Sequence, residues 1–173
     1  MTEATSSSLK IFQKQHKLKA DGELNDATYQ KLTWEAFTKE GIPKVKGKEI
    51  VSRAAKYKGV PYVFGGTTTK GFDCSGYVQH VFKDCKAKLP RLADEQALQG
   101  IFVTQKQLRP GDLVFFTTYA AGASHVGIYA GDGQFWSASS SKGVMLSSLK
   151  DDYWKQRYYG ARRVLITNGE VYK

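Results

Sequence analysis

The sequence predicts an α+β fold in which helices pack on a small antiparallel sheet, with a short helical segment at the N-terminus. Helical periodicity of the apolar residues is confined to the part of the chain before about residue 85. Short runs rich in β-branched and aromatic residues follow from Asp112, and glycine-containing turns separate them. Helices first and consecutive strands afterwards are typical of helices segregated to one face of an antiparallel sheet.

Length and composition indicate one folded domain with a small appendage. The chain has 173 residues, of which 41% are apolar and 13% aromatic, enough for a real core. The longest stretch poor in charge, residues 113–130, contains Gly122, Ser124 and His125 and falls short of the roughly 20 apolar residues of a membrane span. We expect no transmembrane helix. The first residues, "MTEATSSSLK", lack the features of a secretory signal, so a protein working outside the cell would have lost its signal from this chain.

The net charge is strongly positive. The chain has 26 Lys and Arg against 16 Asp and Glu, or +10, which indicates attraction to a polyanion such as nucleic acid, anionic lipid or an anionic cell wall. The basic residues are scattered, and no basic helix or aromatic binding motif is visible, so we do not expect nucleic-acid binding. Surface solubility is an alternative that needs no partner.

The first part of the chain predicts a helix, a turn and a second helix over residues 9–37. The turn falls at residues 20–22, and Asn25 or Asp26 is placed to cap the second helix. Residues 41–48 combine glycine, proline and charge without periodicity, as linkers do. The chain therefore divides into a helical segment, a linker and a main domain, residues 1–40, 41–48 and 49–173.

The main domain opens with two predicted helices. Residues 49–59 form an amphipathic pattern that ends at Gly59, and a second apolar stripe runs from Cys74 to about Cys85. "GDG" at residues 131–133 is the clearest hairpin signal. The predicted strands are "DLVFFTT", "HVGIYAG", "QFWSAS", "GVMLSS" and "YGARRVLI".

The two cysteines do not suit a disulfide or a zinc site. Cys74 and Cys85 lie 11 residues apart, and on one helix that is about 16 Å of rise, against a Cα separation under about 7 Å for a disulfide. The chain has no C-x-x-C pair and three histidines, which argues against a metal, and we expect no cofactor. Cys85 lies on the apolar stripe and is most simply a core residue.

Cys74 is a candidate nucleophile because it would be the first residue of its helix, directly after Asp73. Unpaired N–H groups and the helix dipole stabilise a thiolate there, so we expect a pKa below the usual value near 8.5. The alternative is a small buried core residue. Among candidate bases, His80 would point roughly 120° away around the helix, and His16 lies in the N-terminal segment. His125, which opens a predicted strand between small residues, remains.

Several motifs along residues 49–166 resemble one family. In order they are "GVPYVFGGTTTKGFDCSGYVQHVF", "LPRLADEQ", "LRPGDLVFF", "SHVGIYAGDGQFWSASSSKGV" and "YWKQRYYGARRV". This pattern is similar to that of the NlpC-type (NlpC/p-sixty) cysteine peptidases, papain-like enzymes that cut the peptide stems of peptidoglycan. The resemblance implies an endopeptidase, cutting next to a diamino acid, in an extracytoplasmic place, secreted or associated with the cell wall.

The resemblance also implies roles for individual residues. Cys74 corresponds to the nucleophile and His125 to the general base. Tyr62 resembles a tyrosine that faces the reacting carbonyl, and Asp73 and Ser75 resemble residues that contact the amino end of the substrate in some members. A thiolate would attack the amide, an imidazolium would protonate the leaving amine, and water would release the acyl-enzyme.

The third position of the family's site departs from the pattern. The family usually has histidine there, in a "HAS" context, whereas this chain reads Trp-Ser-Ala-Ser at 136–139, which puts Ser137 in that place. The third group of such sites orients the base. Across a hairpin turning at 131–133, Ser137 would lie opposite Gly127 and diagonal to His125, about 7 Å away between Cα atoms. We expect either a bridging water or a Cys-His dyad.

The N-terminal segment "FQKQHKLKADGELNDATYQKL" is similar to the end of a peptidoglycan-binding domain, whose first half this chain lacks. It is interpreted as a truncated wall-binding element, or alternatively as a packing extension. Two other functions also stay open for the whole chain. One is a wall-binding protein whose catalytic site has decayed, and the other is an amidase or acyltransferase that uses the same dyad.

Overall fold

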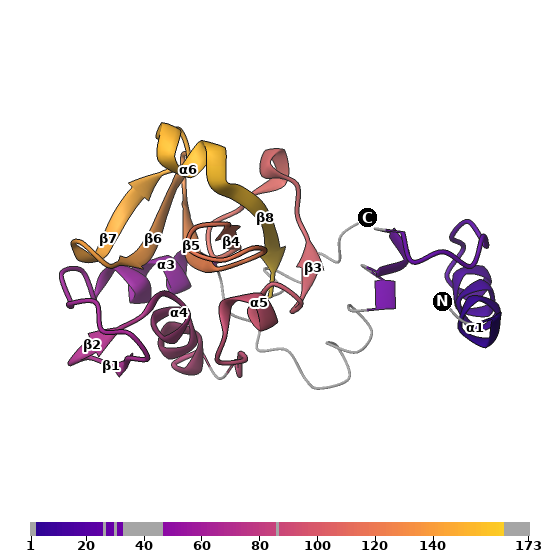
Figure 1. The fold of residues 1–173 in the computed structure, drawn as a ribbon, viewed down its shortest axis with the longest axis horizontal. Helices are drawn as coiled ribbons and strands as arrows, with labels where there is room; N and C mark the ends of the chain where they lie inside the picture. Colours follow the sequence, from indigo (N-terminus) through magenta and orange to yellow (C-terminus); the bar gives the residue numbers. More distant parts are fainter. Residues whose placement is uncertain (1–2, 26, 30, 33–46, 86, 165–173) are drawn as a thin grey trace.

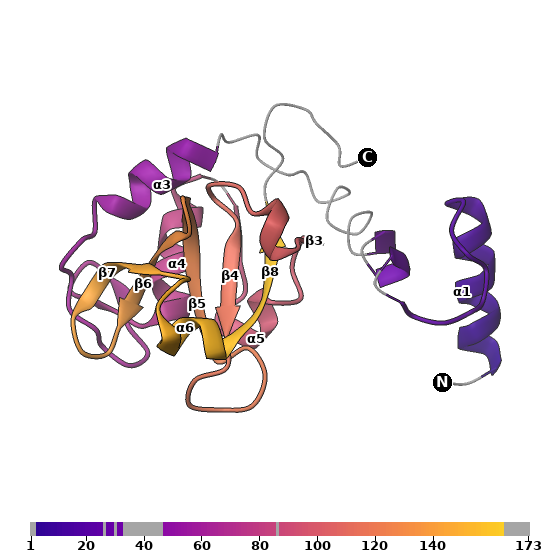
Figure 2. The same ribbon diagram turned by 90° about the horizontal axis from the view of Figure 1, so that it is seen from above.

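The computed structural model describes residues 3–25, 27–29, 31–32, 47–85 and 87–164. It contains a six-stranded sheet of order β3-β8-β4-β5-β6-β7, and all of its neighbouring strands pair antiparallel. The helices α3 and α4 cover one face and α6 lies toward the other (Figures 1 and 2). The predicted α+β fold is confirmed. The strands of this sheet are β3 (Ile101–Phe102), β4 (Leu113–Phe116), β5 (His125–Gly131), β6 (Gln134–Ser139), β7 (Gly143–Ser148) and β8 (Tyr158–Arg163).

The helices of the main domain are short. A small hairpin, β1 and β2, precedes α4. No helix in the described ranges is both long enough and apolar enough to cross a membrane. The remaining elements are α1 (Glu3–Gln15), α3 (Gly47–Ala55), β1 (Thr67–Thr68), β2 (Gly71–Phe72), α4 (Cys74–Lys83), α5 (Ala93–Gln96), the 3-10 helix η1 (Gln105–Gln107) and α6 (Asp152–Arg157).

The hairpin between β5 and β6 sets the register of the site. Asp132 and Gly133 both have positive φ, 53° and 77°, as a two-residue type I′ turn requires. Ile128 pairs with Trp136, and the same register continued places Gly127 opposite Ser137. The hairpin predicted at "GDG" is therefore confirmed.

Two apolar clusters lie on the two faces of the sheet. The helix-side core joins the sheet to α3 and α4 and contains Trp136 and Ala138. The aromatic core on the other face contains Phe116 and Phe135, with Trp154 of α6 packed against it. Side chains alternate along β6, so Ser137 faces the aromatic core while its two neighbours face the helices.

A buried ion pair joins β8 to the start of β4. Arg163 Nε donates to Asp112 Oδ1 at 2.7 Å and Arg163 Nη2 donates to Asp112 Oδ2 at 2.8 Å. The guanidinium also donates to the carbonyl of Gln107 at 2.9 Å. Both side chains are less than a tenth exposed, so the pair lies inside the protein.

The N-terminal segment is organised around a buried glutamine. Helix α1 begins at Glu3, earlier than the predicted start near residue 9. The Gln13 amide donates to Thr28 Oγ1 at 2.9 Å and accepts from the N–H of Gly22 in the turn at 2.8 Å. Asn25 Oδ1 accepts from the N–H of Thr28, as a cap does. Asp26, the other candidate cap, lies outside the described residues, as do residues 41–46 of the predicted linker. Gly47 and Lys48, at the end of that predicted linker, belong to α3.

Candidate active site

The start of α4 is fixed by Asp73 and by a close backbone approach. Asp73 Oδ1 accepts from the N–H of Gly76 at 2.7 Å, and Oδ2 accepts from the N–H of Gly65 at 3.0 Å. A Cβ on Gly76 would lie 2.1 Å from the carbonyl oxygen of Gly66, so only glycine lets the helix and this loop meet. Cys74 opens the helix directly after this cap, where the sequence places it.

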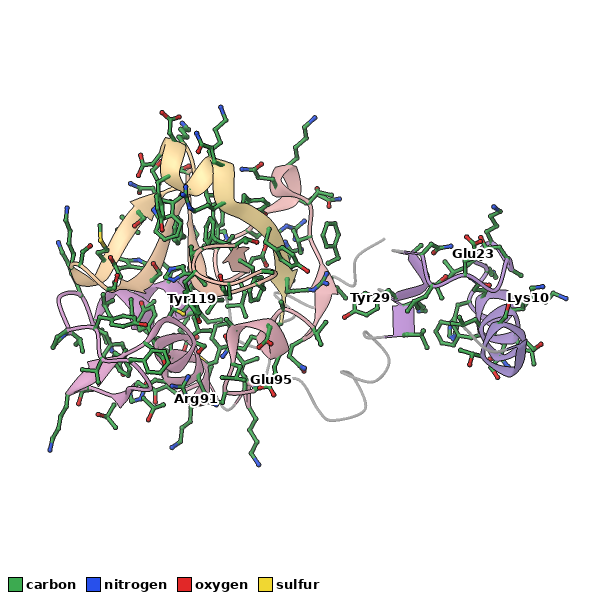
Figure 3. The ribbon with its side chains drawn as sticks, viewed as in Figure 1. Lys10, Glu23, Tyr29, Arg91, Glu95 and Tyr119 are labelled. Carbon is green, nitrogen blue, oxygen red and sulfur yellow. The ribbon has the colours of Figure 1, made fainter. Side chains whose placement is uncertain are left out.

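Arg91 completes the surroundings of Asp73. Its guanidinium pairs with both carboxylate oxygens of Asp73, one of them at 3.0 Å, and donates to Ser75 Oγ at 2.9 Å. Protein donors therefore already occupy the Asp73 carboxylate. The sequence reasoning assigned no role to Arg91, although it lies in the quoted motif "LPRLADEQ". Figure 3 labels Arg91 and Tyr119 on the main domain, and both side chains line a cavity together with Cys74.

Cys74 is buried, and burial changes its acidity. The thiol is 5% exposed and its Sγ lies 4.0 Å from the carbonyl oxygen of Ser124, just before β5. Burial raises the pKa of Cys74, and the neighbouring Asp73 adds to this rise. Backbone N–H groups of Val126 and Ser75 oppose it without cancelling it. The expectation of a lowered pKa was wrong because desolvation outweighs the N–H groups at the helix start.

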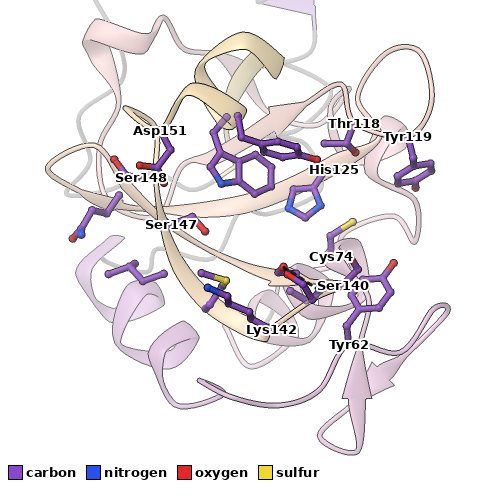
Figure 4. A pocket seen from close by; sticks show the side chains of 18 residues that line it. Tyr62, Cys74, Thr118, Tyr119, His125, Ser140, Lys142, Ser147, Ser148 and Asp151 are labelled. Carbon is purple, nitrogen blue, oxygen red and sulfur yellow. Dashed lines mark hydrogen bonds between the residues drawn. The ribbon is translucent and has the colours of Figure 1, made fainter.

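His125 is the histidine that the fold brings to Cys74 (Figure 4). It opens β5, it is 8% exposed, and burial lowers its pKa to about 4, so the imidazole is neutral and able to accept a proton. Its ring lies against Trp154, with centroids 5.0 Å apart. His80 instead contacts the rings of Tyr57 and Phe72.

Ser137 lies on the same face of the sheet as His125 but is not bonded to it. Its side chain is fully buried. Among the residues that the structure describes, neither Ser137 Oγ nor His125 Nε2 has a hydrogen-bond partner. The predicted diagonal placement therefore agrees with the register, and Ser137 Oγ and His125 Nε2 are not hydrogen-bonded to each other.

Two cavities meet at Cys74. The larger, about 770 Å³, is also lined by His125 and Trp154, and runs along the β6–β7 hairpin (Figure 4). The smaller, about 340 Å³, is lined by the side of the helix start that carries Asp73, Ser75 and Arg91. Tyr62 and Tyr119 line both cavities.

Of these two tyrosines, the sequence pointed to Tyr62 and not to Tyr119. Tyr62 lines both cavities together with Cys74, and its role toward the reacting carbonyl stays a prediction from the resemblance. Burial, and then the nearby Cys74, raise the pKa of Tyr62, which keeps its hydroxyl protonated as a donor. Tyr119 was not predicted, because it lies in the loop between β4 and β5, where no periodic pattern marks it.

The two thiols should differ in reactivity although burial raises the pKa of both. Cys74 opens onto both cavities, whereas Cys85 is 3% exposed within the helix-side core. We expect iodoacetamide to label Cys74 roughly tenfold or more faster than Cys85 near neutral pH, because access decides the rate. Peptide mass mapping after brief exposure measures the ratio. Equal labelling of the two thiols in the folded protein would contradict this prediction.

Known proteins are similar to this chain over the region that carries the motifs. The profile of the NlpC/P60 family matches residues 59–163, more than half of the chain. The chain is 49% identical over 124 residues to "Gamma-DL-glutamyl hydrolase" of Bacillus subtilis (strain 168), a match that covers 70% of this chain and 30% of that protein. It is 50% identical over 117 residues to "Murein DD-endopeptidase MepS/Murein LD-carboxypeptidase" of Escherichia coli (strain K12), which covers 67% of this chain and 62% of that protein. The chain thus spans less than two thirds of the length of these relatives.

Solved structures give the same result for the fold. The structure of an NlpC/P60 family protein from Bacillus cereus ATCC 10987 superposes with a TM-score of 0.67 at 31% identity, covering 72% of this chain and 42% of that one. The NlpC/p60 domain of the peptidoglycan hydrolase SagA gives a TM-score of 0.62 at 31% identity and covers 69% of this chain and 99% of that domain. The fold is thus the papain-like fold that the motifs imply, and this chain belongs to the NlpC/P60 family.

Proposed function

We propose that this protein is a cell-wall hydrolase that cleaves the peptide stems of peptidoglycan, with Cys74 as nucleophile and His125 as base. One observation carries the proposal: the first residue of α4 and the first residue of β5 open onto the same cavity of about 770 Å³. The relatives named as a murein endopeptidase and a glutamyl hydrolase support this substrate class. The net charge of +10 suits retention on an anionic wall, which implies work outside the cytoplasm.

The proposed reaction begins from a neutral thiol and a neutral imidazole, as the shifted pKa values of both groups require. His125 takes the thiol proton as Sγ adds to the scissile carbonyl, and a tetrahedral oxyanion forms. In this scheme the backbone N–H of Ser75 and the Tyr62 hydroxyl donate to that oxygen. The imidazolium then gives its proton to the leaving amine, and a thioester remains on Cys74. Water, deprotonated by His125, releases the acyl group and restores the thiol.

The smaller cavity is proposed to hold the part of the stem on the amino side of the cut. Ser75 lines it, and Asp73 keeps one wall in place through Arg91 and the helix cap. Asp73 would therefore shape this subsite rather than bind the substrate through a free carboxylate. Tyr119, which is 74% exposed at the rim, is available to cover the bound peptide.

The N-terminal segment is proposed to be a separate unit of residues 1–40, joined by the linker at 41–48 to the domain at 49–173. Its likeness to half of a wall-binding domain supports a role in wall attachment. The guanidinium of Arg162 lies 5.3 Å from the ring centroid of Tyr29, a contact that favours the alternative of a packing extension. Removing the first 40 residues and measuring binding to sacculi distinguishes these two roles.

Purified peptidoglycan tests the function directly. We expect the protein to release fragments whose masses correspond to cuts between residues of the stem. Release of whole stems from the glycan strands would indicate an amidase, and transfer to an added amine would indicate an acyltransferase. Binding to sacculi without release of any fragment would favour the decayed, wall-binding alternative and contradict the proposal.

Ser137 offers a test of the third position. We propose that a water bridges the two unpaired atoms, Ser137 Oγ and His125 Nε2. Ser137→Ala removes one partner of this water and leaves the His125 ring less well oriented. Because general-base catalysis contributes about 10²–10⁴-fold, we expect kcat to fall about tenfold. Ser137→His supplies a direct partner and should raise kcat about tenfold, while overpacking a buried site costs about 1–3 kcal/mol of stability. Steady-state rates and thermal unfolding measure both effects. If neither variant changes kcat, Ser137 has no part in catalysis and Cys74 and His125 act as a dyad.

A further inference from the structure

The ring of His125 has an aromatic neighbour on one face. The Trp154 ring is tilted by 30° from the imidazole plane, and the two ring centroids are 5.0 Å apart. Phe116 is the other aromatic ring in contact with His125, but it is more distant at 6.1 Å and tilted by 53°. Trp154 is thus the nearer of these two aromatic neighbours of the proposed base.

Trp154 is itself held in place by the aromatic core. Its ring lies 4.7 Å from that of Phe116 and 5.1 Å from that of Phe135, which it meets at 88°. Tyr153 adds a perpendicular contact at 4.9 Å. Trp154 also lines the larger cavity, so the indole forms part of the wall beside the reacting atoms. A side chain with three ring neighbours presents a fixed surface to the imidazole.

Hydrogen bonds among the described residues do not fix the orientation of the His125 ring. Its Nε2 is buried and has no hydrogen-bond partner among the described residues. A water between it and Ser137 would fix one nitrogen, but it would leave the faces of the ring unsupported. His125 also lies in an apolar setting, where the charged form of the ring is costly. An aromatic ring packed against the imidazole can limit the tilt of its plane and favour its positive charge.

We propose that Trp154 is a positioning residue for His125: the indole packed against the imidazole holds its plane toward Cys74 and stabilises the imidazolium that forms when the thiol proton is transferred. The centroid distance of 5.0 Å lies within the roughly 6 Å over which a cation and an aromatic face attract. The electron-rich face of tryptophan favours the charged ring over the neutral one. Since the charge exists only after proton transfer, the effect falls on kcat rather than on substrate binding. This inference rests on the proposed function.

Substitutions at position 154 test the proposal. Trp154→Leu should lower kcat about tenfold or more and leave KM within about twofold, because the contact acts after binding. Trp154→Phe keeps an aromatic ring and should recover most of the loss. Trp136 is the matched control, since it lies on the neighbouring strand β6 but faces the helix-side core. Trp136→Phe should leave kcat unchanged.

Fluorinated tryptophans at position 154 distinguish stabilisation of the imidazolium from simple packing. They also provide a second test in case the Trp154→Leu protein does not fold. Fluorine withdraws electron density from the indole face and changes its shape little. We expect kcat to fall stepwise with the number of fluorine atoms while the unfolding temperature stays constant. An unchanged kcat across the series would overturn the cation–π role.

Alkylation of Cys74 provides a readout that needs no peptidoglycan. Its rate also depends on transfer of the thiol proton to His125, so Trp154→Leu and the fluorinated series should slow it, whereas Trp136→Phe should not. If the parent protein cleaves no wall fragment but the alkylation rates follow this order, the proposed function fails and the role of Trp154 stands. If the parent cleaves and neither kcat nor alkylation responds at position 154, the inference fails and the proposed function stands.

Discussion

Cys74→Ala should abolish the release of peptidoglycan fragments, with kcat reduced by about 10⁴-fold or more, as expected when a covalent nucleophile is removed. No other described thiol can replace it, because Cys85 is enclosed in the helix-side core. Alanine is smaller than cysteine and leaves the cap formed by Asp73 intact, so the fold and the cavity should persist. Mass spectrometry of digests measures the loss, and sedimentation with sacculi shows that binding is retained.

Cys85→Ala is the matched control for this variant. It removes the other buried thiol of the same helical region and should leave the cleavage rate close to that of the parent. A Cys74→Ala protein that still releases fragments at a rate within tenfold of the parent would refute the nucleophile assignment. Loss of cleavage in Cys85→Ala with an unchanged fold would also contradict the assignment, because Cys85 would then be a thiol that the reaction needs.

Arg163→Met should destabilise the domain by about 3–5 kcal/mol, because it leaves a buried carboxylate without its partner. Asp112 is 2% exposed and accepts two bonds from Arg163. The backbone N–H of Arg109 also donates to this carboxylate, at 2.7 Å. Urea denaturation at neutral pH measures the change as a lower midpoint with an unchanged slope.

The pH dependence of that loss follows from Asp112. Burial raises its pKa, and the bonds from Arg163 and the N–H of Arg109 oppose the rise. Without Arg163 the pKa of Asp112 in the folded state lies further above that of the unfolded chain. The neutral carboxyl then favours folding at low pH, and this contribution is lost as the pH rises through the folded pKa. The deficit of Arg163→Met should therefore be smaller at pH 4 than at pH 7. The double variant Arg163→Met/Asp112→Asn should recover much of the stability at pH 7; a single variant within about 1 kcal/mol of the parent would contradict the argument.

The features that local chemistry determines were predictable from the sequence. Asp73 before an apolar stripe predicts a capped helix, and Asp132-Gly133 predicts a type I′ turn because both residues accept positive φ. The turn then fixes the register, which is why the placement of Ser137 relative to Gly127 was accessible. Cys74 and His125 both open predicted elements, which made them candidates, and the resemblance to the NlpC-type family then implied their roles.

The features that depend on distant parts of the chain were not predictable. Arg91 and Asp73 are 18 residues apart and meet only in the folded domain. Trp154 reaches His125 from a six-residue helix that shows no helical stripe in the sequence. The pKa of Cys74 depends on both kinds of feature. The helix start, which the sequence shows, favours the thiolate and lowers the pKa. Burial of the thiol, which depends on the tertiary fold, raises the pKa by more.

The position of β8 within the sheet determines what happens to the domain when the chain is truncated before this strand. β8 lies between β3 and β4, so a polypeptide that stops before Tyr158, by premature termination or by proteolysis, leaves β3 without a partner strand and β4 with an open edge. Such exposed edges recruit other chains and promote aggregation. The hairpins from β4 to β7 can form earlier, but they cannot close the domain. A truncated product should therefore precipitate or be degraded rather than persist as a folded domain.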